Sequence, residues 1–350
     1  MMKTTELKLL TFAILLILSV PLRAQTLFVN ATEGKDDASG TLRAPLASLD
    51  KAVSRANTFS GKEPITIKIA PGLYTLVNPL VVRPGSNLPA NTKFTFEAMD
   101  MPGDKTWTPA KMPVIQCVAD SNRTGKLKHA SIAFQVERND VVIKGLKFTG
   151  NPNPASLYYY VIQRRDSTLT GLEISQCYFV GDKNSAPMQG GVFAQGAGIT
   201  VDHCIFYGIK NAVMVFSGLK DFSLTHSIIY GAYEGAVWYG YGQSSYSPFT
   251  FHDNIVADGN YFWVGYRGVH PNYQFSNSVI AGNASYMGFN EDEIIPDRLN
   301  KPVEKGIRKS GTVLLNEVTA KGIPGDYLNL SPASAGKDID AGIFLNSKNK

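Results

Sequence analysis

The sequence predicts an all-β fold, a single-stranded parallel β-helix solenoid with an amino-terminal cap helix. Three observations carry this prediction. A segment of alternating apolar residues recurs from about residue 140. Its copies lie 23–31 residues apart, and similar residues occupy equivalent positions in each copy. A repeat of this length, built from short strands, is typical of one solenoid turn per copy. Helical repeats are excluded because the apolar residues alternate with period two instead of 3.6.

The copies of this segment share two columns of residues. They span 141–150, 172–181, 199–208, 222–231, 249–258 and 273–282. A mostly small or polar column comprises Leu146, Cys177, Cys204, Ser227, Asn254 and Ser278. An apolar column comprises Phe148, Phe179, Phe206, Ile229, Val256 and Ile280. Stacked turns place like residues above one another about 4.8 Å apart. We therefore expect the apolar column to fill the core and the polar column to form a hydrogen-bonded ladder.

The amino terminus has the pattern of a secretory signal peptide. Residues 1–24 hold two early lysines, an apolar run at 9–20 and a small residue, Ala24, at the end. The run is shorter than the roughly 20 residues of a membrane span. We therefore expect a secreted or periplasmic protein with no membrane partner, in which residues 25–350 form one β-helix domain.

The elements of this domain follow in chain order. A strand at 27–29 precedes an amphipathic helix at 45–56, which is expected to seal the end of the core. The first coil begins at 65–74, and a loop rich in Pro, Met and Lys is inserted at 98–113. Residues 291–330 lose the repeat, so we expect them to fold back as a carboxy-terminal cover.

Composition excludes several classes of protein. The chain has 34 Lys and Arg against 29 Asp and Glu, which gives a net charge of +5. This small excess of positive charge does not indicate a nucleic-acid-binding surface. Three cysteines in 350 residues make no disulfide framework. Stacking would bring Cys177 and Cys204 close enough for a disulfide, but buried thiols are the favoured interpretation. We expect a monomer.

Five stretches of the sequence resemble the right-handed parallel β-helix superfamily typified by pectate lyases, and in particular its secreted bacterial members. They lie at 28–37, at 45–52, at 69–74, at 96–98 with 112–115, and at 327–332 with 338–342. The resemblance implies a right-handed coil and a polysaccharide as the ligand. It does not imply a reaction, because this fold hosts lyases, hydrolases, epimerases and non-catalytic adhesins.

An aromatic strip marks the predicted site. Each later copy is followed by a further strand, at 211–216, 235–240, 261–267 and 284–289. Successive side chains of a strand face opposite sides, so these strands are expected to form a sugar-binding groove over residues 211–289. The predicted substrate-binding residues are Phe216, Trp238, Tyr241, Tyr261 and Trp263. The alternative is that a loop, the carboxy-terminal cover or a partner packs over the strip.

Two reactions make different demands on the charged residues near the strip. Glycoside hydrolysis needs two carboxyl groups about 5–10 Å apart, which Glu234 and Asp258 would supply. β-Elimination from a uronate needs a base and a positive group on the sugar carboxylate. Arg267 with His270, or Lys210 with Lys220, would supply these.

The predicted catalytic residues are therefore Arg267, His270, Glu234, Asp258 and Lys220. Because basic candidates outnumber paired acidic ones, we favour a polysaccharide lyase. The catalytic signatures of the superfamily's known branches are absent from the sequence. The alternatives are a glycoside hydrolase of the same fold and a non-catalytic glycan-binding or surface protein.

No metal site is predicted with certainty. Residues 291–293 (Glu-Asp-Glu) form an acidic cluster that offers oxygen ligands to Ca²⁺, although a polar surface turn is the favoured interpretation. His203 and His226 share a column with Gln176, Asp253 and Asn277. This mixed polar content favours a solvated or ladder position over a metal site.

Overall fold

The computed structural model describes residues 25–60, 62–84, 92–121, 129–182, 184–240, 249–266, 273–290 and 302–345. The expected signal peptide, 1–24, lies outside these ranges. Within them, no helix is long and apolar enough to cross a membrane.

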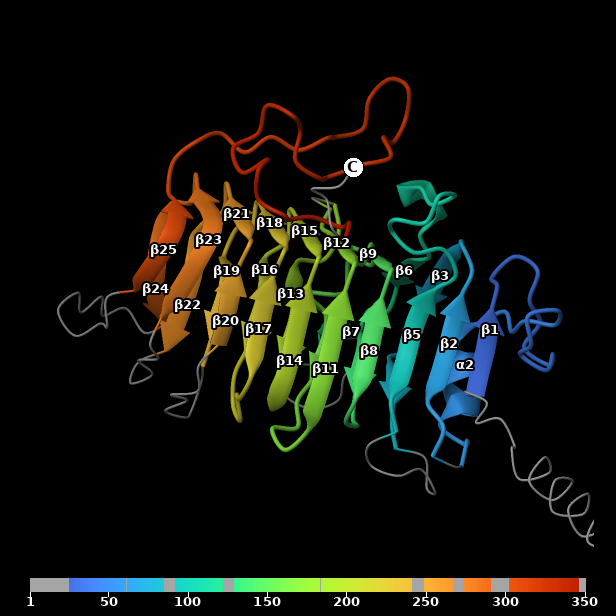
Figure 1. The fold of residues 1–350 in the computed structure, drawn as a ribbon. Helices are drawn as coiled ribbons and strands as arrows, with labels where there is room; N and C mark the ends of the chain where they lie inside the picture. Colours follow the sequence, from blue (N-terminus) through green and yellow to red (C-terminus); the bar gives the residue numbers. More distant parts are fainter. Residues whose placement is uncertain are drawn as a thin grey trace, which may run out of the picture.

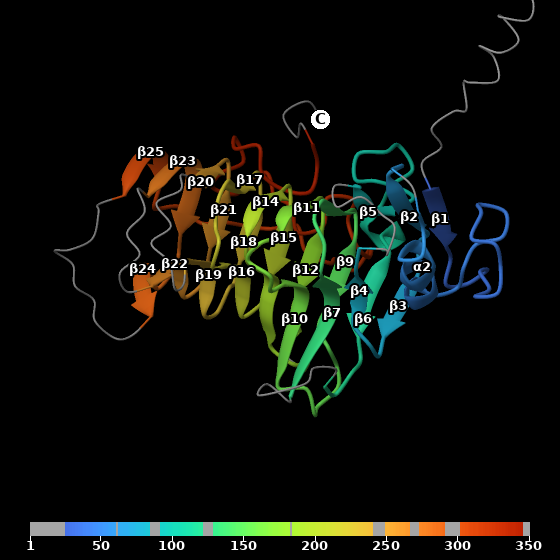
Figure 2. The same cartoon turned by 90° about the horizontal axis from the view of Figure 1, so that it is seen from below.

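The chain winds through three columns of parallel strands, and each full coil contributes one strand to each column (Figure 1, Figure 2). The first column holds β1 (Gln25–Val29), β2 (Ile65–Ile69), β5 (Phe94–Ala98), β8 (Val141–Lys144), β11 (Thr170–Ser175), β14 (Ala197–Asp202), β17 (Phe222–Thr225), β20 (Phe249–His252), β23 (Gln274–Ala281) and β25 (Val303–Arg308). The second holds β3 (Leu73–Leu76), β6 (Val114–Cys117), β9 (Lys147–Thr149), β12 (Tyr178–Val180), β15 (Ile205–Tyr207), β18 (Ile228–Tyr230), β21 (Ile255–Ala257) and the end of β23. The third holds β4 (Leu80–Val82), β7 (Ala130–Val136), β10 (Tyr158–Arg164), β13 (Met188–Ala194), β16 (Asn211–Val215), β19 (Gly235–Tyr239), β22 (Tyr261–Tyr266) and β24 (Ser285–Asn290).

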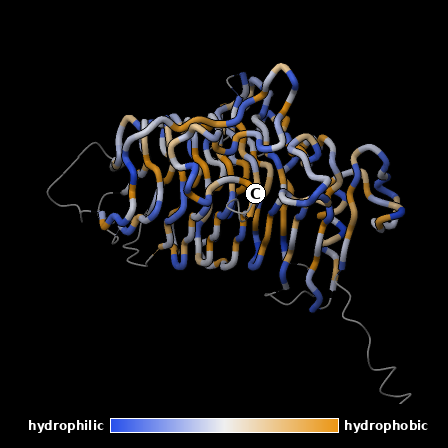
Figure 3. Tube along the Cα trace, turned by 45° about the horizontal axis from the view of Figure 1, so that its top comes forward, coloured by the Kyte–Doolittle hydropathy of each residue, from blue (hydrophilic) through white to orange (hydrophobic). Residues whose placement is uncertain are grey.

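This strand order is that of a parallel β-helix. Among the described residues, the first two columns form one 17-stranded sheet and the third forms an 8-stranded sheet. Neighbouring coils pair in parallel, so residues of equal position stack, as Phe148, Phe179 and Phe206 do. Figure 3 shows apolar residues recurring along the stacked coils.

The apolar column predicted from the sequence fills the core. Phe148, Phe179 and Phe206 are fully buried. The ring centroids of Phe148 and Phe179 lie 5.0 Å apart, and those of Phe179 and Phe206 lie 4.5 Å apart with nearly parallel planes. Offset stacking of this kind adds to the hydrophobic gain from burial. The prediction for this column is therefore confirmed.

The polar column forms the expected ladder. The hydroxyl of Ser227 accepts a hydrogen bond from the backbone amide of Cys204 at 3.1 Å, and the side chain of Asn254 accepts one from the amide of Ser227 at 3.0 Å. The hydroxyl of Ser278 accepts from the amide of Asn254 at 3.0 Å. Each buried donor at this bend thus finds its partner on the next coil, which avoids the cost of an unsatisfied buried amide.

A helix follows the first strand, but it is shorter than the sequence predicted. Helix α2 spans Leu49–Ala56 and not 45–56, because Ser48 is its N-cap and accepts a hydrogen bond from the amide of Lys51 at 3.2 Å. Leu46 instead bridges to Val29 as extended chain. The helix buries one apolar side in the main core beside β1 and β2, while its role as a cap stays a prediction.

Two long segments pack on the outside of the second column (Figure 1). They are residues 99–113, which include the 3-10 helix η1 (Pro109–Lys111), and the carboxy-terminal residues 309–345, which follow β25. The side-chain amide of Gln176 donates to the carbonyl of Pro102 at 2.9 Å and to that of Ile343 at 3.1 Å, so it joins the two. Together they bury a second apolar cluster that includes Ile205, Ile228, Ile255 and Val279. In the expected carboxy-terminal cover, residues 303–308 instead continue the first column as β25, whereas residues 309–330 lie on the second column.

The three cysteines are free thiols and buried, so the disulfide alternative for Cys177 and Cys204 is wrong. Burial raises the pKa of the Cys204 thiol well above its usual value, and thiolate is the reactive form. We expect a thiol reagent to leave the folded chain unlabelled and to label three thiols in denaturant, as counted by mass spectrometry. Rapid labelling of Cys204 in the folded chain would contradict this burial.

Candidate functional site

The outer face of the 8-stranded sheet carries part of the aromatic strip that the sequence predicted. Phe193, Met214, Trp238 and Val264 stand at one register position of successive strands β13, β16, β19 and β22. Their neighbours Val192, Val213 and Val237 lie in the core. Since side chains alternate along a strand, the strip faces away from the core. We call this surface the outer sheet face.

A polar network stands on this face at the start of β16 and β19. The side-chain amide of Asn211, which is fully buried, donates to the carbonyl of Gln189 at 2.9 Å and to Glu234 Oε2 at 2.6 Å. Its oxygen accepts from Trp238 Nε1 at 2.6 Å. One amide therefore positions both a carboxylate and an indole ring. Gly235 leaves room for that ring, since a Cβ there would lie 2.6 Å from Trp238 Nε1.

Lys210 is the cation of this network. Its Nζ donates to Gln189 Oε1 at 3.0 Å and lies 3.5 Å from Glu234 Oε1. It also lies 5.8 Å from the centroid of the Tyr158 ring, which is within cation–π distance. The side chain of Lys210 is 24% exposed, so a ligand in solution can reach it. An ammonium has three N–H donors, so Lys210 can donate to a ligand carboxylate as well as to Gln189 and Glu234.

The predicted substrate-binding residues differ in where their side chains lie. Trp238 and Tyr261 are half-buried on the outer sheet face, as expected. Phe216 belongs to the same face but is only 7% exposed, since it packs edge-on against Phe193. Tyr241 lies outside the described residues.

The expectation for Trp263 is wrong. Its side chain is fully buried, and its register partner on β19 is the core residue Val237. Phe262 is also fully buried in the same cluster, so two successive side chains of β22 belong to the core. Strict alternation, which placed Phe262 inside and Trp263 outside, fails at this point. Trp263 is a core residue.

The predicted catalytic residues are partly separated. Glu234 belongs to the Lys210 network. Asp258 instead stacks on Gly231 of the neighbouring coil, and Gly231 lies three residues before Glu234. Asp258 hydrogen-bonds the hydroxyl of Tyr230, which with burial raises the Tyr230 pKa to about 12. Lys220 pairs with Ala197 where the chain enters the first column, at the other end of β16 from Lys210. Arg267, His270 and the acidic cluster 291–293 lie outside the described residues.

Three residues of the network were not predicted from the sequence: Tyr158, Gln189 and Asn211. Tyr158 and Gln189 come from the two coils that precede Lys210, and neither stands in a repeat column. Asn211 begins β16, where strict alternation from the outward Met214 would place it toward the core. Ala212 and Val213, which follow it, are both in the core cluster, so alternation is interrupted here.

Further hollows lie elsewhere on the described part of the coil, and two of them differ in their walls. One, of about 530 Å³, is at the turn between the second and third columns and is lined by Asp182, Tyr207, Tyr230 and Tyr233, among others. The rings of Tyr207 and Tyr230 are parallel with centroids 5.9 Å apart, and Tyr207 donates to Glu317 at 3.0 Å. This hollow has aromatic walls, and the carboxylate of Asp182 at its edge accepts a hydrogen bond from the backbone amide of Asn184 at 2.8 Å.

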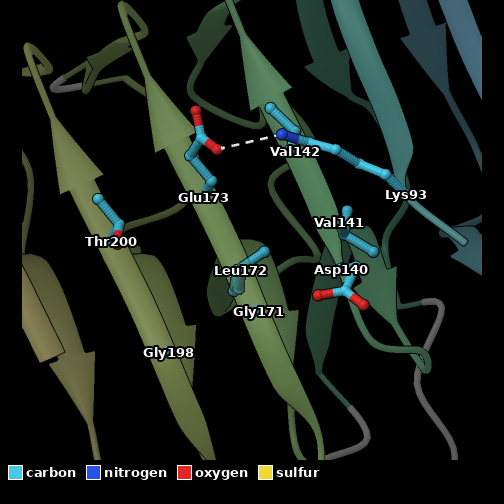
Figure 4. A pocket seen from close by; sticks show the side chains of 9 residues that line it. All are labelled: Lys93, Asp140, Val141, Val142, Gly171, Leu172, Glu173, Gly198 and Thr200. Atoms are coloured by element: carbon cyan, nitrogen blue, oxygen red, sulfur yellow. Dashed lines mark ion pairs between the residues drawn. The ribbon is translucent and has the colours of Figure 1, made fainter. Parts of the chain in front are cut away.

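The second hollow lies on the first column, over β8, β11 and β14, and has a volume of about 480 Å³ (Figure 4). Lys93 and Glu173 form an ion pair of 3.6 Å across it, and both side chains are about half exposed. Its described lining residues include glycine, valine and leucine but no aromatic residue. These described residues therefore offer a sugar no ring to stack on.

No family model and no curated protein matches the chain. Among solved structures, it is similar to a rhamnogalacturonan lyase with 12% identity and a TM-score of 0.40, covering 92% of this chain and all of that one. It is also similar to the GH136 lacto-N-biosidase from Eubacterium ramulus, with 9% identity and a TM-score of 0.30, covering 82% of this chain and 68% of that one. At such identities, the chemistry of this chain has to be derived from its own residues.

Proposed function

We propose that the chain is an exported polysaccharide lyase that cleaves a uronate-containing polymer on the outer sheet face. The observation that carries the proposal is the position of Lys210. It is an accessible cation, fixed by Gln189 and Glu234, beside the exposed ring of Tyr158 and on the same face as Trp238. A cation for the carboxylate and rings for the sugar faces are the two features that a uronate requires.

The reaction assigned to this face is β-elimination. A base removes the proton from the carbon next to the uronate carboxylate, the bond to the glycosidic oxygen breaks, and a carbon–carbon double bond forms. The leaving oxygen takes up a proton. Negative charge develops on the carboxylate during proton removal, and Lys210 is placed to stabilise it. His270 or Arg267, predicted from the sequence as the base, remains the candidate for the proton transfer.

The test uses the tag-free mature chain and a panel of uronate polymers, including pectate, alginate and rhamnogalacturonan, with and without Ca²⁺. A lyase produces an unsaturated uronate, which is followed by its ultraviolet absorbance. We expect this absorbance to rise for at least one polymer. A flat trace on every polymer, in a preparation shown to be folded by circular dichroism, would overturn the proposal.

A second candidate function is glycoside hydrolysis, for which the sequence offers the carboxyl groups of Glu234 and Asp258 on neighbouring coils. New reducing ends without ultraviolet absorbance would support it. Retention of the polymer with neither product would instead support a non-catalytic glycan-binding protein. Both outcomes use the same incubation, so one experiment separates the three functions.

A further inference from the structure

A cluster of imidazole and carboxylate groups lies away from the outer sheet face, at the bend between the first and second columns. His203, His226 and Asp253 occupy this bend on three successive coils, each with a positive φ of 49–55°. Asp202 and His252 are the last residues of β14 and β20. These side chains contact one another across the coils, and the function proposed above does not use them.

The geometry around His226 is that of a pre-oriented ligand. Its Nδ1 lies 2.8 Å from Asp202 Oδ1, so this nitrogen carries the proton and donates to the carboxylate. The other ring nitrogen, Nε2, faces Asp253 Oδ2 at 3.7 Å. This separation is too long for a hydrogen bond. Two ligand atoms that share one tetrahedral metal at about 2.0–2.1 Å lie roughly 3.3 Å apart, so 3.7 Å is close to that spacing.

His252 completes the set. Its Nδ1 lies 2.7 Å from the same Asp253 Oδ2, and its ring is perpendicular to that of His226, with the centroids 5.4 Å apart. One ligand atom from each of His226, His252 and Asp253 lies within 4.8 Å of the others. Perpendicular rings allow an ion to lie in the plane of both imidazoles.

We propose that His226, His252 and Asp253 bind a divalent transition-metal ion of the Zn²⁺ type, with the fourth position open to water. Two neutral imidazoles and one carboxylate are donors that Zn²⁺ prefers, and three protein ligands with an open position are a common zinc arrangement. The ion replaces the hydrogen bond between His252 and Asp253. The proton of His252 then moves from Nδ1 to Nε2.

Partners outside the three ligands fix their orientation. Asp202 holds His226 in the tautomer that leaves Nε2 open, and the amide of Asn277 donates to Asp253 Oδ1, which leaves Oδ2 for the ion. Such outer hydrogen bonds are typical of histidine and carboxylate metal ligands. Asp340 of the carboxy-terminal segment adds negative charge near His226. The surroundings therefore favour a cation at this point.

The site also has a route for entry and a consequence for stability. The side chains of His252 and Asp253 are 38% and 19% exposed, so an ion reaches them from solvent. The ligands come from neighbouring coils, and the carbonyl of His226 accepts a hydrogen bond from Gly342 of the carboxy-terminal segment at 2.9 Å. A bound ion therefore joins two coils beneath that segment, and binding to the folded state alone stabilises it.

The test is a titration of the tag-free chain, stripped with EDTA and dialysed, with ZnCl₂ in a calorimeter. We expect one Zn²⁺ per chain and a rise in the unfolding temperature. Co²⁺ is expected to give the visible absorption bands of tetrahedral coordination. His252→Gln and Asp253→Asn are expected to weaken binding by about 10-fold or more. Asparagine tolerates the positive φ of residue 253, so the fold is retained.

His129→Gln is the matched control, because His129 is an exposed histidine at the start of β7. It is expected to bind Zn²⁺ as the parent chain does. The proposal is overturned if the parent chain shows no saturable Zn²⁺ binding, or if His252→Gln and Asp253→Asn bind as well as the parent. In the first case His226 is an imidazolium shared by Asp202 and Asp253, which its nuclear magnetic resonance titration would show. The result is independent of the lyase assay, since it concerns a different part of the coil.

Discussion

Replacing Lys210 with alanine is expected to lower kcat/KM on the cleaved uronate polymer by about 100-fold or more. The lysine faces the charge that develops on the sugar carboxylate, and removing one such group typically costs this much. Lys210→Arg keeps the charge and is expected to restore part of the rate. Initial rates of unsaturated product formation, measured over a range of polymer concentrations, give the change in kcat and KM separately.

Lys144→Ala is the matched control for this change. Lys144 is also an ion-paired lysine, 3.4 Å from Glu97 and 32% exposed, but it lies on the first column. Its replacement is expected to leave kcat/KM unchanged. The assignment of Lys210 fails if Lys210→Ala retains full activity. Loss of activity in Lys220→Ala alone would move the site to the corner where Lys220 lies.

Trp263→Ala is expected to lower the free energy of unfolding by about 3–5 kcal/mol, because it removes a large side chain from a closed core. The indole is fully buried among Tyr239, Phe249 and Phe275, with ring centroids 5.1–5.3 Å away. Trp263→Phe, which leaves a smaller cavity, is expected to cost less. Urea unfolding followed by circular dichroism measures both.

Trp238→Ala provides the contrast, since Trp238 is half-buried on the outer sheet face. It is expected to cost less stability than Trp263→Ala and to weaken glycan binding. A chain that keeps its stability after Trp263→Ala and loses glycan binding would restore the expectation drawn from the sequence. It would contradict the burial described above.

The repeat itself was predictable because stacking acts on like residues. Phe148, Phe179 and Phe206 were identified as a core column from their spacing alone, and Ser227 and Asn254 as a ladder. These residues depend on contacts with the same position of the next coil. A sequence that repeats its residues therefore also predicts its contacts.

The fold was less predictable where a local feature interrupts the repeat. Helix α2 begins at Leu49 because Ser48 caps it, although the apolar spacing extends back to Leu46. In β22, Phe262 and Trp263 are both apolar, so alternation alone does not decide which of them faces the core. In the structure both are buried in the core.

The site was predictable only in part, since its contacts join residues of different coils. Trp238 and Glu234 were identified from the sequence, but Asn211, which holds both, is 27 and 23 residues away from them. Gln189 lies 21 residues before Lys210. The spacing of 23–31 residues between copies does not show which turn residues become neighbours, because that depends on the register of the paired strands.

A crystal structure of the Lys210→Ala chain with a uronate oligosaccharide from the cleaved polymer is the most direct test of glycan binding on the outer sheet face. The account predicts sugar rings over Trp238 and Tyr158, with a carboxylate facing the space left by the Lys210 side chain, on the side away from Glu234. Sugars bound instead at the hollow of Tyr207 and Tyr230, or over Lys93 and Glu173, would contradict it.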